Sequence, residues 1–348
     1  MFKRQLLKSA IAGAVVLTAT SMVSSTVSAE EVKLRLHQFL PPVAVVPAKI
    51  LKPWGETVNK ASGGKIVIEH FDAMSLGGRP PALMDQAKDG VVDMAMTVVG
   101  YTPGRFPRSE VFELPFMMTN PVATSAAFWD FVESDLQDTE YKDLKVLGAW
   151  VHGPGLIHST DPINKLEDMK GKVLRGPTRV ITDMLNEFGA TPVGMPLPAI
   201  PQSLSKGVID STVIPWEVTP SIRLTELVEN HTEFSGDEAL YTATIVLVMN
   251  KAKYDSMPAD LRAVLDAEAG KKLSTFAAQV MWDWDAPARD IAVKAGNNII
   301  TLDEAEVARW KAAAAPVVDR WKATMADKGI DGQATIKKAK SLIAKNAQ

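Results

Sequence analysis

The stretch KIVIEHFDAMSLGGRPPALMDQAKDGVVDMAM, residues 65–96, indicates the fold class of this chain. Lys65–Phe71 predicts a β-strand, and Pro80–Lys88 predicts a short helix that ends at Gly90. Val91–Met96 then predicts a further strand, rich in apolar residues. Strands that alternate with helices in this way are typical of an α/β fold, in which helices cover a parallel sheet.

The same pattern continues on both sides of this stretch. Val32–His37 alternates apolar and polar residues, which predicts a strand, and Val46–Asn59 predicts a helix. Further elements are expected downstream: strands at residues 144–151, 156–159, 172–175, 208–213 and 242–250, and a helix at residues 180–188. Apolar residues at helical spacing, with abundant alanine, predict helices over Ala259–Trp284 and Leu302–Lys328 and a last helix at 337–348.

The N-terminus has the features of an export signal. Basic residues at positions 3, 4 and 8 precede the apolar run Ala10–Met22, and the small residues Val27-Ser28-Ala29 follow it. The run is shorter than the roughly 20 apolar residues that a membrane span needs. We therefore expect a signal peptide at residues 1–29, cleaved after Ala29, and a periplasmic protein; an uncleaved anchor is the alternative.

Composition excludes several classes of protein. Three of the 38 basic residues lie in the expected signal peptide, which leaves 35 against 41 acidic residues, a net charge of −6. This mild acidity does not suit a nucleic-acid-binding protein. The chain has no cysteine, which excludes disulfides, thiolate metal sites and cysteine nucleophiles. The 319 of 348 residues that remain after cleavage suggest two lobes rather than one core.

No arrangement of catalytic residues is recognisable in the sequence. The five histidines form no pair with the helical spacing and the intervening glutamate of a zinc protease. The Gly-x-Ser-x-Gly nucleophile motif and the glycine-rich phosphate-binding motifs are absent as well. We therefore expect neither a catalytic metal nor a cofactor, and a large exported α/β protein of this kind suits a receptor whose chemistry is recognition.

Five short motifs resemble those of the solute receptors of TRAP (tripartite ATP-independent periplasmic) transporters, the DctP-type family. Leu166–Arg175, LEDMKGKVLR, is similar to the family's P-x-D-L-K-G-x-K-I-R, and Gly189–Pro196, GATPVGMP, to its G-A-x-P-x-x-m-P. Leu204–Asp210, LSKGVID, is similar to L-x-x-G-v-v-D. Gly90–Met94 and Glu113–Phe116 resemble G-x-x-D-m and x-l-P-f. The order and spacing of the five motifs extend the likeness over nearly the whole chain that follows the signal.

The resemblance implies a two-lobed periplasmic binding protein fold, with mixed sheets flanked by helices, a long bridging helix and a ligand cleft between the lobes. We expect an N-terminal lobe of residues 30–151 and about 242–285. The C-terminal lobe, with the bridging helices, is expected to contain residues 152–241 and about 286–348. The resemblance also implies a small and a large integral membrane TRAP subunit as partners, and transport driven by an ion gradient rather than by ATP.

In this family the arginine that ends the K-G-x-K-I-R motif pairs with the ligand carboxylate, and Arg175 stands at that position. A guanidinium group presents a planar fork of donors that fits a carboxylate. Ile157 stands where many relatives have a second arginine, and Ile214 where many have an asparagine. A buried polar group without a partner is costly, so these apolar residues disfavour a dicarboxylate. We expect a small organic monocarboxylate with an apolar, aromatic or cationic body.

The body of the ligand is expected to contact residues at strand ends and in loops. The candidates are Phe39, Tyr101, Trp150, His152, Ile214, Trp216 and Glu217. Aromatic side chains can stack on an arene or face an ammonium or sulfonium group, and Glu217 would add a negative charge in the second case. A receptor for a zwitterionic onium carboxylate, such as a betaine, a sulfonium or an ectoine-like compound, is therefore the alternative function. A periplasmic lyase-type enzyme is a third possibility, and the sequence leaves open whether a metal ion near Glu217 bridges the ligand.

Overall fold

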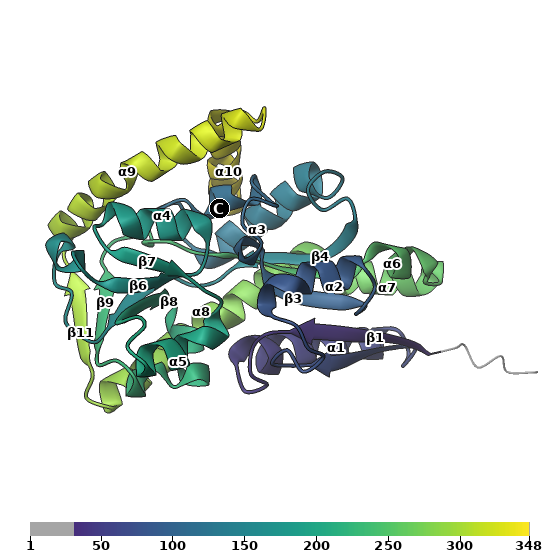
Figure 1. The fold of residues 1–348 in the computed structure, drawn as a ribbon. Helices are drawn as coiled ribbons and strands as arrows, with labels where there is room; N and C mark the ends of the chain where they lie inside the picture. The colour runs from purple at the N-terminus through teal and green to yellow at the C-terminus, as the bar shows by residue number, and fades with distance from the viewer. Residues whose placement is uncertain (1–30, 348) are drawn as a thin grey trace, which may run out of the picture. The chain divides into compact units, whose positions relative to one another are not determined.

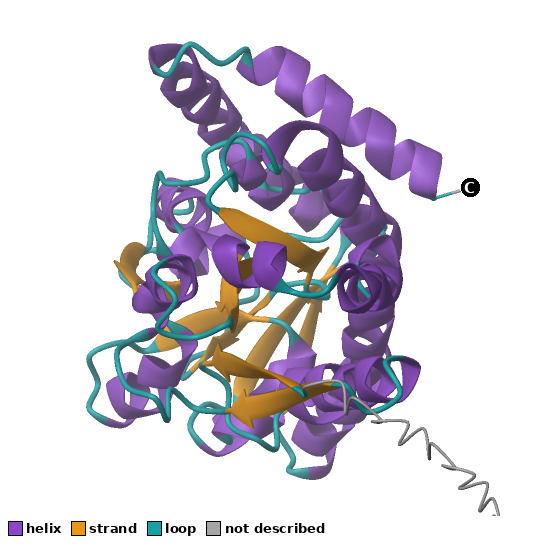
Figure 2. Cartoon of the chain, turned by 90° about the vertical axis from the view of Figure 1, so that its right-hand side faces the viewer, coloured by secondary structure: helices purple, strands orange, loops and turns teal. Residues whose placement is uncertain are grey.

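Two β-sheets, each covered by helices, organise the chain in the computed structural model (Figures 1 and 2). The structure describes residues 31–347. The expected signal peptide and its cleavage site lie outside these residues. None of the described helices is long and apolar enough to cross a membrane.

The first sheet forms the first lobe and has the strand order β2-β1-β3-β10-β4. Its strands are β1 (Val32–Gln38), β2 (Ile66–Phe71), β3 (Met94–Val98), β4 (Leu144–Val151) and β10 (Thr244–Asn250). The first three strands are parallel, as the opening stretch of sequence predicts, and β1 lies between β2 and β3. β10 runs antiparallel to β3 and β4, so the sheet is mixed. All seven residues of β10 are buried, which suits a strand with neighbours on both sides.

The second sheet forms the second lobe and has the strand order β11-β9-β5-β8-β6-β7. Its strands are β5 (Leu156–Ser159), β6 (Val173–Gly176), β7 (Thr191–Gly194), β8 (Ser211–Ile214), β9 (Asn230–Phe234) and β11 (Asn298–Leu302). β6 pairs in parallel with β7 and β8, whereas β5 is antiparallel to β8 and β9. The chain thus crosses between the lobes after β4, after β9 and again in its last third.

Helices flank both sheets. They are α1 (Lys52–Ala61), α2 (Leu83–Lys88), α3 (Pro121–Phe131), α4 (Arg179–Glu187), α5 (Ile200–Ser205), α6 (Lys251–Ser256), α7 (Ala259–Glu268), α8 (Gly270–Lys294), α9 (Glu304–Asp327) and α10 (Gly332–Asn346). The long helix α8 packs against α3 and β4 of the first lobe and against the segment that follows β8 in the second (Figure 1). α9 packs on α4 of the second lobe, and α10 packs on α3 of the first. α8 thus contacts both lobes, as expected of the long bridging helix, and α9 and α10, which pack against each other, link the second lobe to the first.

Three expectations about the last third of the chain are wrong. The helix expected over Ala259–Trp284 is broken at Ala269, because Gly270 adopts a left-handed φ of 69° that a continuous helix does not allow. β11 was missed, since its residues are only partly buried and lack a clear alternation. The helix α9 consequently begins later than expected, where the side chain of Asp303 accepts a hydrogen bond from the backbone of Glu306.

Candidate functional site

A cavity lies between the two lobes and contains about 510 Å³ of empty space, part of it continuous with solvent. Its polar lining residues are Tyr101, His152, Arg175, Glu217 and Tyr241. The rest of its wall is almost entirely apolar and includes Phe39, Met96, Val98, Ile214, Val218, Ile245 and Met281. Six of the eight residues expected to contact a ligand thus line one cavity, namely Phe39, Tyr101, His152, Arg175, Ile214 and Glu217.

The sheet topology explains why these residues meet. Phe39 follows β1 and Tyr101 follows β3, and because these strands are parallel, their carboxyl ends lie at the same edge of the first sheet. Arg175 and Ile214 lie near the carboxyl ends of β6 and β8, which are parallel in the second sheet. Ligand sites of α/β proteins lie outside the carboxyl ends of parallel strands, and here two such edges face one cavity.

Arg175 is buried in the wall of the cavity with only 2 % of its surface exposed. Its Nε donates to the carbonyl of Met195 at 2.9 Å, and its Nη1 donates to the carbonyl of Val213 at 3.0 Å. Burial lowers its pKa, and no carboxylate of residues 31–347 is among the groups that act on that pKa. The two carbonyls hold the guanidinium in place, and the side chain of Tyr101 interacts with it as well. A buried cation without a counter-ion is a costly arrangement, which an anionic ligand relieves.

Two tyrosines lie close enough to Arg175 to raise its pKa, namely Tyr101 and Tyr241. The Tyr101 hydroxyl accepts a hydrogen bond from the backbone N–H of Leu197 at 3.0 Å, so its own hydrogen remains available. The Tyr241 hydroxyl is buried and has no hydrogen-bond partner among the described residues. Most buried polar groups are paired, so this hydroxyl is a candidate donor to a ligand bound by Arg175. Tyr241 was not among the expected ligand contacts, and its position just before β10, where the chain crosses back to the first lobe, was its only signal.

His152 lines the cavity, but both of its ring nitrogens already bond to the protein. Its Nε2 accepts from the backbone N–H of Ala243 at 3.0 Å, so its Nδ1 carries the proton and donates to the Gly153 carbonyl at 2.6 Å. Burial is the main cause that lowers the pKa of His152 to about 4, so the ring is neutral at neutral pH. Its part in the cavity wall is therefore that of a fixed ring, edge-on to Tyr241.

Glu217 lines the same cavity and is 5 % exposed. Burial, and then the neighbouring Asp285, raise the pKa of Glu217 well above its usual value, whereas Arg175 is not among the groups that shift it. Burial likewise raises the pKa of Asp285 to about 7. Asp285 belongs to α8, and its Oδ1 accepts from the backbone N–H of Glu217 at 2.9 Å. The cavity thus has a cationic group at Arg175 and a neutral acid elsewhere in its wall.

Two expected contacts are not in this cavity. Trp150 is fully buried in β4 and belongs to the hydrophobic core of the first lobe. Trp216 packs in a separate small cluster with Leu156, and its Nε1 donates to Glu233 at 2.8 Å. Ile157, where relatives often have an arginine, is likewise a buried residue of β5 outside the cavity wall.

Three contacts join the lobes beside the cavity: the Tyr101 hydroxyl with Leu197 N–H, the Thr178 hydroxyl with Glu113 Oε2 at 2.7 Å, and the Arg179 guanidinium with the Glu110 carboxylate. Glu113 also accepts two bonds from Thr244, from its N–H and from its hydroxyl. Gly100 packs directly against Thr178, so that even a methyl group on Gly100 would overlap with it. The two lobes are therefore in close contact over the cavity.

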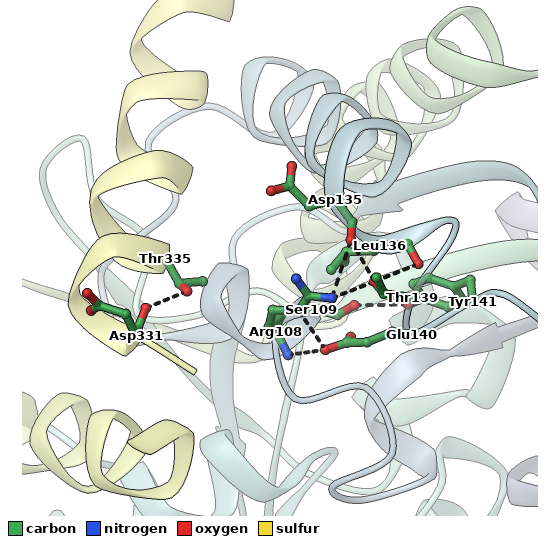
Figure 3. Close-up of polar contacts among 9 residues, drawn as sticks. All are labelled: Arg108, Ser109, Asp135, Leu136, Thr139, Glu140, Tyr141, Asp331 and Thr335. Carbon is green, nitrogen blue, oxygen red and sulfur yellow. Dashed lines mark hydrogen bonds and ion pairs between the residues drawn. The ribbon is translucent and has the colours of Figure 1, made fainter. Parts of the chain in front are cut away.

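Glu110 and Glu113 lie on one short helical segment, η4 (Ser109–Glu113), and hydrogen bonds at the start of this segment hold it to the first lobe. Figure 3 shows this network: Arg108 donates to Glu140 from its backbone N and its Nε, and the hydroxyls of Ser109 and Tyr141 are 3.0 Å apart. Because η4 is anchored, its two glutamates present a fixed surface to the second lobe.

A cavity between two lobes, with a buried arginine that has no counter-ion among residues 31–347, is the arrangement expected of a receptor for a small anion. Residues 31–347 contain no group of acidic and histidine side chains that could hold a metal ion. The chain belongs to the bacterial extracellular solute-binding protein family 7, the DctP family, which it matches over residues 44–324. The resemblance noted in its motifs is thereby confirmed.

Solved structures of TRAP solute-binding proteins share the fold. A protein from Rhodoferax ferrireducens T118, in complex with copurified benzoate, is 48% identical with a TM-score of 0.89 over 91% of this chain and 98% of that one. A marine metagenome protein specific for aromatic acids, in complex with 3-hydroxybenzoate, is 46% identical with a TM-score of 0.90 over 92% of this chain and 100% of that one. A periplasmic protein from Bordetella bronchiseptica, with bound (R)- and (S)-mandelate, is 28% identical with a TM-score of 0.83 over 90% of this chain and 99% of that one. The family and these neighbours are binding receptors rather than enzymes, which removes the lyase from consideration.

Proposed function

We propose that this protein is the periplasmic receptor of a TRAP transporter for aromatic monocarboxylates. The observation that carries the proposal is Arg175, a buried guanidinium that has no acidic partner among residues 31–347 and that lines a largely apolar cavity. A carboxylate bound to its free N–H groups, and to the hydroxyl of Tyr241, would supply the missing partners. An arene would then fill the apolar remainder.

The lining of the cavity supports an arene, because its wall is apolar apart from a few polar side chains. Phe39 and Tyr101 contact each other edge-on in its wall, with ring centroids 5.4 Å apart. The two relatives with the highest identity reported above are described with aromatic carboxylates, which is consistent with this ligand class.

The direct test is a titration of the purified protein with benzoate, and of variants at Arg175. We expect Arg175→Ala to lose about 2–5 kcal/mol of binding free energy, the cost of removing one partner of a buried charge pair. Arg175→Gln keeps a donor for the Met195 and Val213 carbonyls but has no charge, so it should fold and still fail to bind. Arg320→Ala, on the exposed side of α9, is the matched control and should bind normally. Benzoate affinity of wild-type strength in Arg175→Gln would contradict the role of Arg175.

A receptor for a zwitterionic onium carboxylate is the second candidate, and the carboxyl pair Glu217–Asp285 is the observation that favours it. A cation bound next to this pair would favour the ionised form of Glu217 and would be attracted to its carboxylate. Such a ligand should bind more tightly as the pH rises, because Glu217 must ionise, whereas benzoate binding should not strengthen with pH. Calorimetry with a betaine and with benzoate at pH 6 and pH 8 distinguishes the two.

Three further expectations belong to this proposal. The protein works in the periplasm after cleavage behind Ala29, it delivers its ligand to a small and a large membrane subunit, and its lobes consist of residues 30–151 with about 242–285 and residues 152–241 with about 286–348. Mass spectrometry of the exported protein tests the cleavage site, which should leave Glu30 as the first residue.

A further inference from the structure

Arg175 and Tyr241 account for one part of the cavity, but Glu217 has no role in binding a simple carboxylate. Glu217 lines the cavity with only 5 % of its surface exposed, and its carboxyl group has no hydrogen-bond donor or ion-pair partner among residues 31–347. Arg175 acts on the pKa of Tyr101 and of Tyr241 but is not among the groups that act on that of Glu217. Water in the cavity can reach the Glu217 carboxyl group when no ligand is bound. A ligand that displaces the water leaves a costly unpaired polar group unless the ligand itself supplies the partner.

The position of Glu217 is fixed by its surroundings. Its backbone N–H is bonded to Asp285 Oδ1, and Asp285 Oδ2 lies over the backbone of Gly153, where a Cβ would overlap with it. Asp285 is held on α8, the helix that braces both lobes. These contacts fix the backbone of Glu217 at the wall of the cavity.

The chemical state of Glu217 limits what it can bind. Burial and the adjacent Asp285 favour the protonated form, and a protonated carboxyl group has one O–H donor and a carbonyl acceptor. This pair of functions matches a hydroxyl group, which both donates and accepts. The carboxyl group would attract a cation only after losing its proton. An unsubstituted benzoate would leave Glu217 without a partner.

We propose that Glu217 hydrogen-bonds to a ring hydroxyl of the ligand, so that the receptor prefers hydroxylated aromatic monocarboxylates over their unsubstituted parents. This inference rests on the proposed function, because it takes Arg175 to hold the carboxylate. Arg175 then sets the orientation of the ligand, and Glu217 selects among the substitution patterns of the ring.

The test is isothermal titration of benzoate and of 2-, 3- and 4-hydroxybenzoate into the wild-type protein and two variants. The wild type should bind at least one hydroxybenzoate roughly 5- to 150-fold more tightly than benzoate, the factor that corresponds to pairing one buried polar group. Glu217→Leu should abolish this preference while benzoate still binds. Glu217→Gln should keep most of it, because an amide also donates and accepts. Glu226→Leu, at an exposed glutamate of a neighbouring short helix, is the control and should leave the preference unchanged.

The outcomes separate the two proposals. If benzoate binds but no hydroxybenzoate binds better, or if the preference survives in Glu217→Leu, the role of Glu217 is overturned and the aromatic-acid receptor stands. If none of the four acids binds the folded wild-type protein, the proposed function itself fails. A 4-(trimethylammonio)benzoate that binds more tightly than every hydroxybenzoate, increasingly so with pH, would overturn the hydroxyl in favour of a cation. Thermal unfolding of each variant shows that it is folded.

Discussion

Gly100 offers a test of lobe closure that does not touch the ligand site. The residue lies in η3 (Val99–Tyr101) of the first lobe and packs against Thr178 of the second lobe. A Cβ on Gly100 would lie 2.5 Å from the Cβ of Thr178 and closer still to its Cγ2. Carbon atoms attract each other at about 3.5–4.0 Å, so this contact is strongly repulsive. The backbone of Gly100 is not left-handed, so alanine fits the first lobe itself.

The magnitude follows from the geometry. Thr178 cannot move aside freely, because its hydroxyl donates to Glu113 at 2.7 Å. Overpacking of a close contact costs about 1–3 kcal/mol. If the lobes separate when no ligand is bound, this cost falls on the closed state alone. Since 1.4 kcal/mol corresponds to a factor of ten, we expect Gly100→Ala to weaken benzoate binding roughly 5- to 150-fold.

Calorimetry measures the affinity, and small-angle scattering measures whether saturating benzoate still compacts the protein. Gly194→Ala is the matched control, because Gly194 borders the same opening between the lobes and its Cβ would meet no atom within 4 Å. Combining Gly100→Ala with Thr178→Gly should recover part of the loss, since the overlapping atoms are then removed. Unchanged affinity in Gly100→Ala would refute the reasoning. The reasoning would also be refuted if Gly100→Ala destabilised the ligand-free protein by the same free energy as it weakens binding, because the lobes would then be in contact without ligand.

Two further variants test groups beside the cavity. Tyr241→Phe should leave the ligand-free protein equally stable or more stable, because it removes a hydroxyl without a partner among the described residues. The same change should cost about 1.5–3 kcal/mol of benzoate binding, because a hydrogen bond to a charged group is lost. Thermal unfolding measures the stability and calorimetry the binding, and a loss of stability with normal binding would contradict the assignment. Burial raises the pKa of Glu113 from 4.5 to about 7, so between these pH values the folded state binds more protons than the unfolded chain. The free energy of unfolding should therefore fall as the pH rises through this range. Glu113→Gln should make this fall shallower in urea titrations at pH 5 and pH 8, and the same slope as in the wild type would show that Glu113 does not titrate there.

The sequence predicted the part of the site that depends on local motifs. Arg175 ends a strand next to a recognisable motif, and its burial and its position at the cavity follow from the parallel pairing of β6 with β8. The neighbours Trp216 and Glu217 show what a motif does not determine. Both follow Pro215, but they begin the 3₁₀ segment η8 (Trp216–Ile222), in which successive side chains point in different directions. Glu217 therefore lines the cavity, while Trp216 packs away from it.

Residues that join the site through long-range pairing were harder to predict. Tyr241 reaches Arg175 only because the chain returns to the first sheet through β10, antiparallel to β4. Trp150 was expected at the ligand because it lies near a strand end, yet it is Ile245, its partner across β4 and β10, that lines the cavity. Residues paired directly across two strands lie on the same face of a sheet, so the packing around them, and not the pleat, decides which one borders the cavity, and a single sequence does not reveal that packing.

Three polar groups of one cavity are left without protein partners in residues 31–347, namely part of the Arg175 guanidinium, the Tyr241 hydroxyl and the Glu217 carboxyl. Each is costly to bury without a partner, on the order of 1–3 kcal/mol for a neutral group and more for a charge. An open cleft would let water satisfy all three, so the closed state is disfavoured unless a ligand replaces that water. A ligand shifts the balance only by its greater affinity for the closed state, and here that affinity comes from the groups that closure would otherwise leave unpaired. The same unpaired groups therefore determine both which ligand binds and whether the receptor closes, so a ligand that pairs with only one of them should bind weakly and close the lobes incompletely.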